Sequence, residues 1–377
     1  MSKPYIWYSG ATDITAKKLA ATLGCSHGAV KPKPSEADIV ICWGAKTKDN
    51  TVFPAGVVVL NHPDKIRDNR NKLLALETMK AAEINVENFC QRVEDIGKAA
   101  SGVKLPAIGR TKYHQGGKRF WMCPSMTHAK SAYEEGANYF QNMIEIQNEY
   151  RVHVFGGKAI YSVQKVKRTS EEMEAAFIED ELARQKSLAE KAGEVFSEAA
   201  VLPFLKRQAK KFAADGANTM IRSNRLGWKF KRMKSLPKDI EMQAISACKA
   251  LGLDFGAVDM CTDPSGKVWV IEVNTGPGLE ESTFTSYVEV LKDKLKEITD
   301  SRDKAKKAAP LASKAEAVAK TMTAAAGKTT VPKGSTTAEN KKSSLLEKVK
   351  LMREMTEVAS EEEASVLNKV FGKMFTE

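Results

Sequence analysis

The sequence predicts a mixed α/β and α+β protein built from several packed units. With 377 residues, the chain can bury two or three hydrophobic cores. The first 60 residues alternate short apolar strands with a helix, which is the pattern of a parallel α/β unit. Near residue 260, two apolar strands flank a Thr-Asp-Pro-Ser-Gly turn, which indicates an antiparallel hairpin.

The amino-terminal α/β unit is expected to be Rossmann-like and to span residues 1–64. Its elements follow in alternating order: a strand at 5–8, a helix at 12–23, and strands at 38–43 and 57–60. An Asn61-His-Pro turn comes next. Apolar residues at helical spacing then predict a helix over residues 71–82.

The hairpin near residue 260 carries three oxygen ligands. Because side chains alternate along a strand, Val268, Val270, Glu272 and Asn274 are expected to share one face. The turn brings Asp259, on the preceding strand, beside Glu272. Two adjacent carboxylates repel each other, and a divalent cation removes that repulsion. The Asp259, Glu272 and Asn274 oxygens therefore suit Mg²⁺, with Mn²⁺ as a substitute; a surface hairpin with solvated acids is the alternative interpretation.

A second motif, Arg222-Ser223-Asn224 followed by Gly-Trp, precedes the hairpin. Together the two motifs resemble the ATP-grasp ligases, whose second lobe ends in an Asp strand and a Glu-x-Asn strand that hold magnesium. The similarity is greatest to the ribosomal-protein glutamate ligases and their amino-acid-biosynthesis relatives, and it covers residues 36–290. It implies an ATP-grasp fold. In that family, the residue matching Arg222 neutralises the transferred phosphate and the acyl phosphate, and the residue matching Asn224 assists.

The resemblance also implies a phosphate site upstream. A strand and a glycine-containing loop look like the flap over the ATP phosphates, where Gly116 and Gly117 let backbone N–H groups approach closely. Arg110 stands where the family usually has lysine. The phosphate contact is kept by Arg110, taken over by Lys112 or lost, and the sequence leaves these outcomes open. His114 is either a phosphate or substrate contact or an exposed flap histidine.

The remaining ATP contacts are implied in the same way. Asn142, Met143 and Ile144 look like the connecting strand at the adenine edge, although Met143 and Ile144 taken alone also suit a core position. Glu149 resembles the acid that binds ribose. In the family, an arginine lies two residues after this acid, and Arg151 resembles it. Arg151 is either a site residue or half of a structural ion pair. Ser223 completes the implied ATP site.

About fifty residues separate Arg168 from the Arg222 motif, whereas the glutamate ligases keep these motifs close. Apolar residues at helical spacing predict a helical insertion at about 170–216, either a substrate-recognition lid or a packing embellishment. The first ATP-grasp lobe is then expected at 65–140 and the second, with this insertion, at 141–299.

The net charge of +12 is concentrated near the carboxyl end. Residues 301–342 hold ten Lys or Arg against three Asp or Glu, a net +7 of the +12. This Ala-, Lys-, Thr- and Ser-rich composition predicts a basic disordered linker at 300–342, not a folded nucleic-acid surface. Apolar residues at helical spacing predict a helical tail at 343–377, which docks on the catalytic domain, oligomerises or binds another protein.

Six cysteines form no close pair, which predicts reduced, packed thiols and no zinc site or disulfide framework. The sequence shows no signal peptide and no apolar run of membrane-spanning length, so a cytoplasmic protein without a membrane partner is expected.

The expected function is ATP-dependent joining of a carboxylate substrate to an amine substrate through an acyl phosphate. Addition of an amino acid to a protein or peptide is one form of it. Two rivals stay open: an ATP-grasp small-molecule kinase, and a nucleotide-binding scaffold in which the Arg110 departure marks lost catalysis. The sequence does not identify the acid or the amine.

Overall fold

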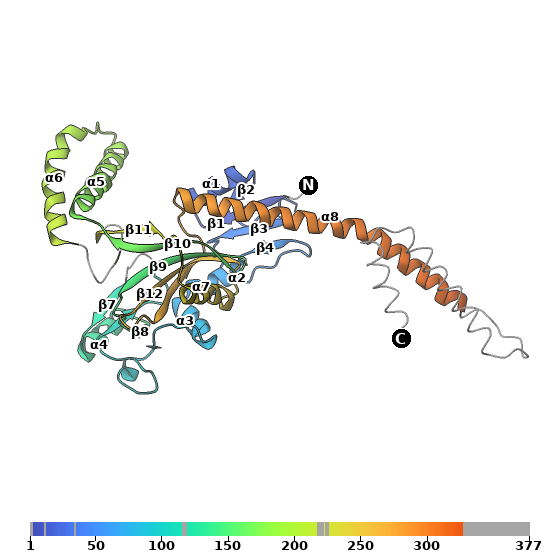
Figure 1. Cartoon of the computed structure of the whole chain (residues 1–377), viewed down its shortest axis with the longest axis horizontal. Coiled ribbons are helices and arrows are strands. Elements are labelled where there is room, and N and C mark those ends of the chain that lie inside the picture. The colour runs from blue at the N-terminus through green and yellow to red at the C-terminus, as the bar shows by residue number, and fades with distance from the viewer. Residues whose placement is uncertain are drawn as a thin grey trace, which may run out of the picture. The chain divides into compact units, whose positions relative to one another are not determined.

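The computed structural model describes residues 3–10, 13–33, 35–114, 119–216, 222 and 226–326, with side chains up to residue 305. The chain divides into two compact units, Ser2–Val290 and a second unit that begins at Leu291. Three sheets and their helices make up the first unit (Figure 1).

The amino-terminal sheet is parallel, with the strand order β2-β1-β3-β4. Its strands are β1 (Pro4–Tyr8), β2 (Ser26–Gly28), β3 (Ile39–Trp43) and β4 (Val58–Leu60), and helix α1 (Ile14–Leu23) connects the first two. Asp13 caps α1 by accepting a hydrogen bond from the Ala16 N–H at 3.0 Å. Every residue of the inner strand β3 is buried, as expected between parallel neighbours. The predicted Rossmann-like unit is confirmed.

The Asn61 turn ties this sheet to the second lobe. Asn61 is fully buried with a φ of 56°. Its side-chain oxygen accepts from the backbone N–H groups of Asp254 and Phe255 at 2.7 and 3.0 Å, and its amide donates to the Phe255 carbonyl at 2.8 Å. Two helices follow, α2 (Pro63–Arg70) and α3 (Lys72–Ala81), where the sequence predicts only the second.

The first lobe contains an antiparallel sheet with the order β5-β8-β6-β7. Its strands are β5 (Phe89–Cys90), β6 (Ala107–Arg110), β7 (Phe120–Cys123) and β8 (Tyr139–Asn142), with the 3-10 helix η1 (Val93–Asp95) and helix α4 (Met126–Glu134) beside them. Buried Ala129 and Ala132 of α4 pack in one cluster with Phe140 of β8. This cluster is separate from the main core.

The second lobe contains a five-stranded antiparallel sheet with the order β11-β10-β9-β12-β13. Its strands are β9 (Asn148–Phe155), β10 (Lys158–Lys167), β11 (Trp228–Arg232), β12 (Phe255–Thr262) and β13 (Val268–Asn274). Val152, Val258 and Met260 belong to one buried cluster with Ile240 and Ala244 of helix α7 (Lys238–Ala250). One face of the sheet is thus apolar and covered by α7, while the opposite face holds both apolar residues such as Phe255 and polar ones such as Arg151.

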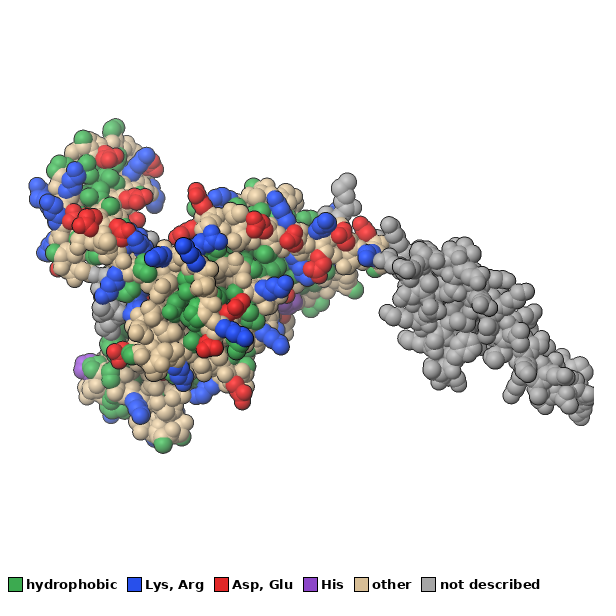
Figure 2. All heavy atoms as spheres, in the orientation of Figure 1, with side chains coloured by type: hydrophobic (Ala, Val, Ile, Leu, Met, Phe, Trp, Pro, Cys, Tyr) green, Lys and Arg blue, Asp and Glu red, His purple; other side chains and the backbone are tan. Residues whose placement is uncertain are grey.

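The predicted helical insertion is confirmed as a hairpin of α5 (Ser170–Ala192) and α6 (Glu198–Asp215). A capping box between Thr169 and Glu172 starts α5. The rings of Phe177 and Phe212 lie 5.4 Å apart between the helices. Acidic and basic side chains are interspersed over its surface (Figure 2).

Helix α8 (Glu281–Ala326) begins in the first unit. The sequence predicts a disordered linker from residue 300, whereas the helix continues to Ala326. The reason is that Ala and Lys are strong helix formers even where little apolar surface is available for burial. The rest of the predicted linker and the predicted helical tail at 343–377 lie outside the described residues.

All six cysteines are free, and five of them are buried, which agrees with packed thiols. Over the described residues, we find no helix that is both long and apolar enough to span a membrane.

Candidate functional site

The face of the second-lobe sheet opposite helix α7 carries the predicted metal residues. Cross-strand register places Asp259 of β12 opposite Glu272 of β13 on one side and opposite Arg151 of β9 on the other. Residues directly opposite each other in an antiparallel pair share a face. The hairpin therefore juxtaposes the two carboxylates as the sequence predicts.

The predicted alternation along β13 is wrong at one point. The register shifts between Asp259 and Met260, which makes Ile271 of β13 the extra residue of a β-bulge. Val268, Val270 and Val273 all belong to the buried core, so the first two do not share a face with Glu272 and Asn274. The extra residue reverses the alternation, because one unpaired residue moves every later side chain to the other face.

The three predicted ligands converge. The Asn274 side-chain amide donates to Asp259 Oδ2 at 3.0 Å and to Glu272 Oε1 at 3.2 Å. One amide nitrogen therefore lies within hydrogen-bond distance of both carboxylates, and a half-turn of the amide would present its oxygen instead. Two carboxylates and one amide oxygen are donors that Mg²⁺ accepts. The described residues include no cluster of three His, Cys, Asp or Glu, so this set depends on the asparagine.

Cations offset both carboxylates. Arg151 donates from Nε and Nη2 to the two Asp259 oxygens at 2.6 and 2.8 Å, a bidentate pair. Lys72 Nζ lies 3.1 Å from Glu272 Oε2. Burial alone raises the pKa of Glu272, but Lys72 and the Asn274 amide outweigh it and hold that pKa below its ordinary value. Burial likewise lowers the pKa of Arg151, but its contact with Asp259 dominates and raises it.

A tight contact fixes the end of β13. The Gly44 N–H donates to the Thr275 carbonyl at 3.0 Å, which joins β3 to the segment after Asn274. A Cβ on Gly276 would lie 3.0 Å from the Gly44 Cα, so only glycine fits without movement. This close approach is a structural reason for the first glycine of the Gly-Pro-Gly sequence after β13.

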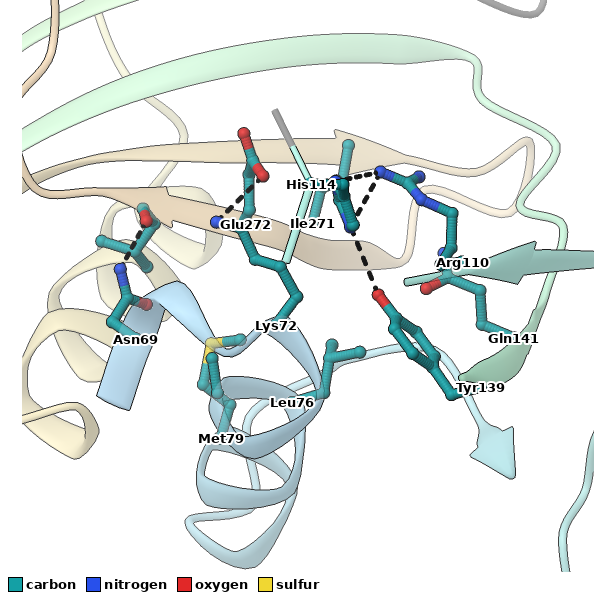
Figure 3. A pocket seen from close by; sticks show the side chains of 12 residues that line it. Asn69, Lys72, Leu76, Met79, Arg110, His114, Tyr139, Gln141, Ile271 and Glu272 are labelled. Carbon is teal, nitrogen blue, oxygen red and sulfur yellow. Dashed lines mark hydrogen bonds and ion pairs between the residues drawn. The ribbon is translucent and has the colours of Figure 1, made fainter. Parts of the chain in front are cut away.

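Glu272 borders a cavity of about 40 Å³ (Figure 3). Helices α2 and α3, strands β6, β8 and β13 and the segment after β6 supply its lining, which includes Asn69, Lys72, Arg110, His114, Tyr139 and Glu272. The cavity therefore joins the first lobe to the predicted metal residues. Its volume suits water or an ion, not a nucleotide.

Arg110 points toward this cavity in Figure 3. Its Nη2 lies 2.7 Å from His114 Nδ1, and its buried Nε has no hydrogen-bond partner among the described residues. Burial, with the nearby charges of Arg110 and Lys72, lowers the pKa of His114 to about 4, so the ring is neutral at pH 7 and accepts the hydrogen bond from Arg110. Tyr139 Oη lies 3.5 Å from His114 Nε2. His114 is thus a half-buried partner of Arg110, not an exposed flap residue.

The other flap residues contribute less. The Lys112 carbonyl accepts from the Lys72 N–H at 2.8 Å, which anchors the start of α3, and no ammonium contact of Lys112 is seen among the described residues. Gly116 and Gly117 lie outside the described residues.

The residues predicted at the adenine edge, Asn142, Met143 and Ile144, are accessible to different degrees. The Asn142 side chain is hydrogen-bonded to neighbouring backbone groups. Its oxygen accepts from the Lys104 N–H at 2.8 Å, and its amide donates to the Gly102 carbonyl at 3.2 Å. Met143 is 42% exposed and Ile144 is half-buried, so neither is a core residue. An apolar surface is therefore available at the predicted adenine edge.

Glu149 is buried and forms an ion pair with Lys165 of the neighbouring strand. Burial raises the pKa of Glu149, and Lys165 opposes that shift. Arg222 donates to the backbone carbonyls of Ile146 and, at 3.3 Å, Gln147. Ser223 and Asn224 lie outside the described residues.

Sequence reasoning missed Lys72, Asn69 and Tyr139. Asn69 is buried and donates to the Val273 carbonyl at 2.8 Å, which holds α2 against β13. A signal for Lys72 was present: a lysine at the first position of a helix is unfavourable for the helix dipole and needs another explanation. Its contact with a residue 200 positions later is not visible in the sequence.

No protein-family model matches the chain, and no curated protein sequence matches it significantly. Among solved structures, the ATP-grasp ligase PsnB, complexed with a phosphomimetic variant of its minimal precursor, Mg and ADP, aligns with a TM-score of 0.50 and 11% identity over 79% of this chain and 99% of that chain. D-alanine–D-alanine ligase from Bacillus anthracis aligns with a TM-score of 0.49 and 12% identity over 80% and 96% of the two chains. A RiPP-associated ATP-grasp ligase from Chryseobacterium gregarium aligns with a TM-score of 0.44 and 14% identity over 78% and 97%. The likeness to PsnB shows that this chain has the ATP-grasp fold.

Proposed function

We propose that this protein is an ATP-dependent ligase that joins a carboxylate to an amine through an acyl phosphate. One observation carries the proposal: Asp259, Glu272 and Asn274 converge on the face of the second-lobe sheet opposite helix α7, in an ATP-grasp fold. Arg151 and Lys72 keep this acidic site neutralised when no metal is bound. Such an arrangement suits a polyanionic substrate that arrives with a divalent cation.

Asp259, Glu272 and Asn274 are the residues that would hold Mg²⁺. When bound, the ion would offset the negative charge of the ATP phosphates beside the two carboxylates. Mn²⁺ has similar ligand preferences and is expected to substitute. Mg and ADP are bound in the PsnB structure, which supports this cofactor set.

The reaction proposed for the organic substrates has two steps. A substrate carboxylate oxygen attacks the γ-phosphorus of ATP, the bond to the bridging oxygen breaks, and ADP leaves. An amine then attacks the acyl carbon, phosphate leaves, and the amine loses a proton. Arg222 and Asn224 are assigned to the transferred phosphate and the acyl phosphate, with Arg110 and Lys72 as further cations at the cavity.

The remaining assignments complete the proposed ATP site. Glu149 binds the ribose, while Met143, Ile144 and the backbone at Asn142 contact the adenine. Of the three outcomes left open for the flap, retention by Arg110 is the one we propose, because its guanidinium is half-buried at the cavity and its Nε has no hydrogen-bond partner among the described residues. We also assign Lys112, Gly116, Gly117 and Ser223 to the proposed ATP site, as the resemblance implies.

We further propose that one substrate is a protein or peptide, because PsnB binds a precursor. The closer kinship with the glutamate ligases depends on the Arg222-Ser223-Asn224 motif and is likewise a proposal. So are the domain bounds 1–64, 65–140 and 141–299, the tail as a docking or oligomerisation element, and a cytoplasmic location.

Glu272→Gln tests the metal assignment. The substitution removes one anionic oxygen and should lower Mg²⁺-dependent ADP release at least about 100-fold, because it weakens the metal shell and leaves Lys72 beside a neutral amide. ADP release and amide formation are measured together, with candidate acids and amines present and absent. Glu77→Gln, an exposed carboxylate on the same helix as Lys72, is the matched control and should behave as wild type.

Equal turnover in Glu272→Gln and wild type would exclude the metal site. ADP release and a phosphorylated acid that need no amine would indicate a kinase. Nucleotide binding without turnover in any substrate screen would indicate a scaffold protein.

A further inference from the structure

The outer strands of the second-lobe sheet continue the face that holds Asp259. Asp259 of β12 lies opposite Arg151 of β9, Arg151 lies opposite Val163 of β10, and Val163 lies opposite Arg232 of β11. These four residues form one row across the sheet, and directly opposed residues share a face. Arg232 therefore stands on the same face as the metal residues, at the edge strand.

Cations and aromatic rings alternate along this part of the face, which we call the β10–β11 strip. It consists of Tyr161, Lys165, Lys167, Trp228, Phe230 and Arg232. The Arg232 guanidinium lies 5.1 Å from the Tyr161 ring centroid, and Lys167 Nζ lies 5.9 Å from that of Trp228. Arg151 and Lys165 lie 5.0 and 5.8 Å from the Phe230 ring. The rings hold the cations in place without neutralising them.

Two cations of the strip have no acidic partner. Arg151 and Lys165 form ion pairs with Asp259 and Glu149. In the described part of the chain, neither Lys167 nor Arg232 forms an ion pair, and both side chains are exposed. Two exposed, positioned cations beside a proposed carboxylate-activating site have the charge needed to bind further anionic groups.

We infer that the β10–β11 strip is a subsite for the acid substrate and that this substrate is an acidic peptide. Lys167 and Arg232 bind carboxylates other than the one that is activated. This inference rests on the proposed ligase function, because it takes the activated group to be a carboxylate near Asp259. Arg232 is the specificity-determining residue of the subsite.

The spacing of the strands decides the size of the substrate. The Tyr161 ring holds the Arg232 charge over β10, and β10 lies two strand spacings, roughly 10 Å, from β12. The two carboxyl carbons of a free dicarboxylic amino acid are four bonds apart and span at most about 5 Å. An extended peptide covers about 10 Å in three residues. A peptide with several acidic residues therefore reaches both places, and a single amino acid does not.

Cations interleaved with aromatic rings also occur in single-stranded nucleic-acid sites. The peptide is favoured because the proposed reaction consumes a carboxylate, which an acidic peptide supplies and a phosphodiester chain lacks. The experiment below separates the two ligands.

The test measures binding of a fluorescently labelled hexaglutamate peptide to the full chain by anisotropy, at low ionic strength and without nucleotide. Hexaglutamine should bind at least about tenfold more weakly, because it lacks the charges. Arg232→Gln should weaken hexaglutamate binding at least about tenfold, since a charge-assisted hydrogen bond is lost. Lys167→Gln should weaken it severalfold. Because Arg232 is exposed, its substitution should leave thermal unfolding unchanged.

Lys231→Gln is the matched control. Lys231 is the exposed neighbour of Arg232 on β11, but it lies opposite Gln164 and faces the other side of the sheet. Its substitution should change hexaglutamate affinity less than about twofold.

Equal losses in Arg232→Gln and Lys231→Gln would overturn the subsite in favour of diffuse attraction. Hexathymidylate binding as tightly as hexaglutamate, with the same Arg232 dependence, would overturn the peptide assignment. The assay contains no ATP, so failure of ligation in the Glu272→Gln experiment is a separate result.

Discussion

Arg222 is held against the backbone before β9 by contacts that a lysine cannot reproduce. Its guanidinium donates to two successive backbone carbonyls, those of Ile146 and Gln147, and lies 4.6 Å from the Trp228 ring centroid. Its buried Nε has no hydrogen-bond partner among the described residues. Planar, divergent donors and a stacked face are properties of arginine. The residue is positioned before any substrate arrives.

Arg222→Lys is therefore expected to reduce kcat about tenfold or more, while the KM for ATP rises less than about threefold. An ammonium bears the charge but not the forked donors that would meet a transferred phosphate. Steady-state ADP release at saturating acid and amine measures both constants. If only KM changes, Arg222 binds ground-state nucleotide and has no part in phosphoryl transfer.

His153 is buried and neutral in the folded protein. Burial, followed by the nearby Arg151 charge, lowers the pKa of His153 from 6.5 to about 3. Its Nδ1 lies 3.3 Å from the Tyr287 hydroxyl. Because the folded pKa is the lower one, the unfolded chain takes up a proton first as the pH falls below about 6.5. Stability from this residue is thus present above pH 6.5 and is lost progressively between pH 6.5 and about 3.

His153→Gln should reduce the loss of stability on acidification. One proton corresponds to a slope of about 1.4 kcal/mol per pH unit, the largest change expected from this single site. Glutamine retains a polar partner for Tyr287, so the protein should still fold at pH 7.5. Urea unfolding from pH 7.5 to 4.5 measures both slopes. Parallel curves for wild type and variant would mean that His153 does not set the acid sensitivity.

Local rules predicted that Asp259 and Glu272 lie side by side, but not their full surroundings. Asp259 and Glu272 follow from a hairpin whose turn is visible in the sequence. The bulge at Ile271 is not visible, because no local residue choice requires it, and it changes which valines face the core. Lys72 was missed since its role depends on a contact across the fold.

Elements with strong periodicity were predictable, whereas short ones were not. Helices α5 and α6 are long and amphipathic, and their existence follows from apolar spacing. Strands β2 and β5 have three and two residues, too few for a pattern, and exist because neighbouring strands pair with them. By contrast, the extension of α8 to Ala326 is supported by its helix-forming composition alone.

We expect the α5–α6 hairpin to bind substrate and not to be required for folding. It borders a cavity of about 510 Å³, whose lining includes Met173, Phe177 and Phe212, a volume in the range of ligand sites. The two described core clusters contain none of its residues. The Arg168 N–H donates to the Gly227 carbonyl at 2.9 Å, so β10 and β11 are already joined at its base.

Replacing residues 171–215 with a short Gly-Ser linker should leave the ATP dissociation constant within about threefold of wild type. The KM of the acid or amine should rise at least about tenfold, because the cavity is removed while the sheet and both carboxylates remain. Isothermal titration with ATP and steady-state kinetics with the identified substrates measure these effects. Unchanged kinetics would make the hairpin a packing embellishment, and insoluble protein would assign it to the folding core.

At the scale of the whole molecule, long-range contacts fix the candidate site. The Asn61 side chain is hydrogen-bonded to the start of β12, almost two hundred residues later, and Gly44 contacts the segment that follows β13. Both contacts tie the amino-terminal sheet to strands β12 and β13. The order of the elements indicated which units exist, but these pairings arise only when distant segments pack. The fold class and the pairing of Asp259 with Glu272 could thus be predicted from the sequence, whereas the contacts from Lys72 and the amino-terminal sheet could not.

Removal of the carboxyl-terminal segment tests this division of the molecule. All described candidate site residues lie within Ser2–Val290, which is a compact unit by itself. A chain that ends at Lys296 should therefore bind ATP with a dissociation constant within about twofold of the full chain and unfold cooperatively. Sedimentation should show that any self-association or partner binding of the full chain is lost, because the basic segment and the predicted tail helices are absent. A truncated protein that precipitates or fails to bind ATP would show that residues beyond Lys296 are needed to fold the catalytic unit.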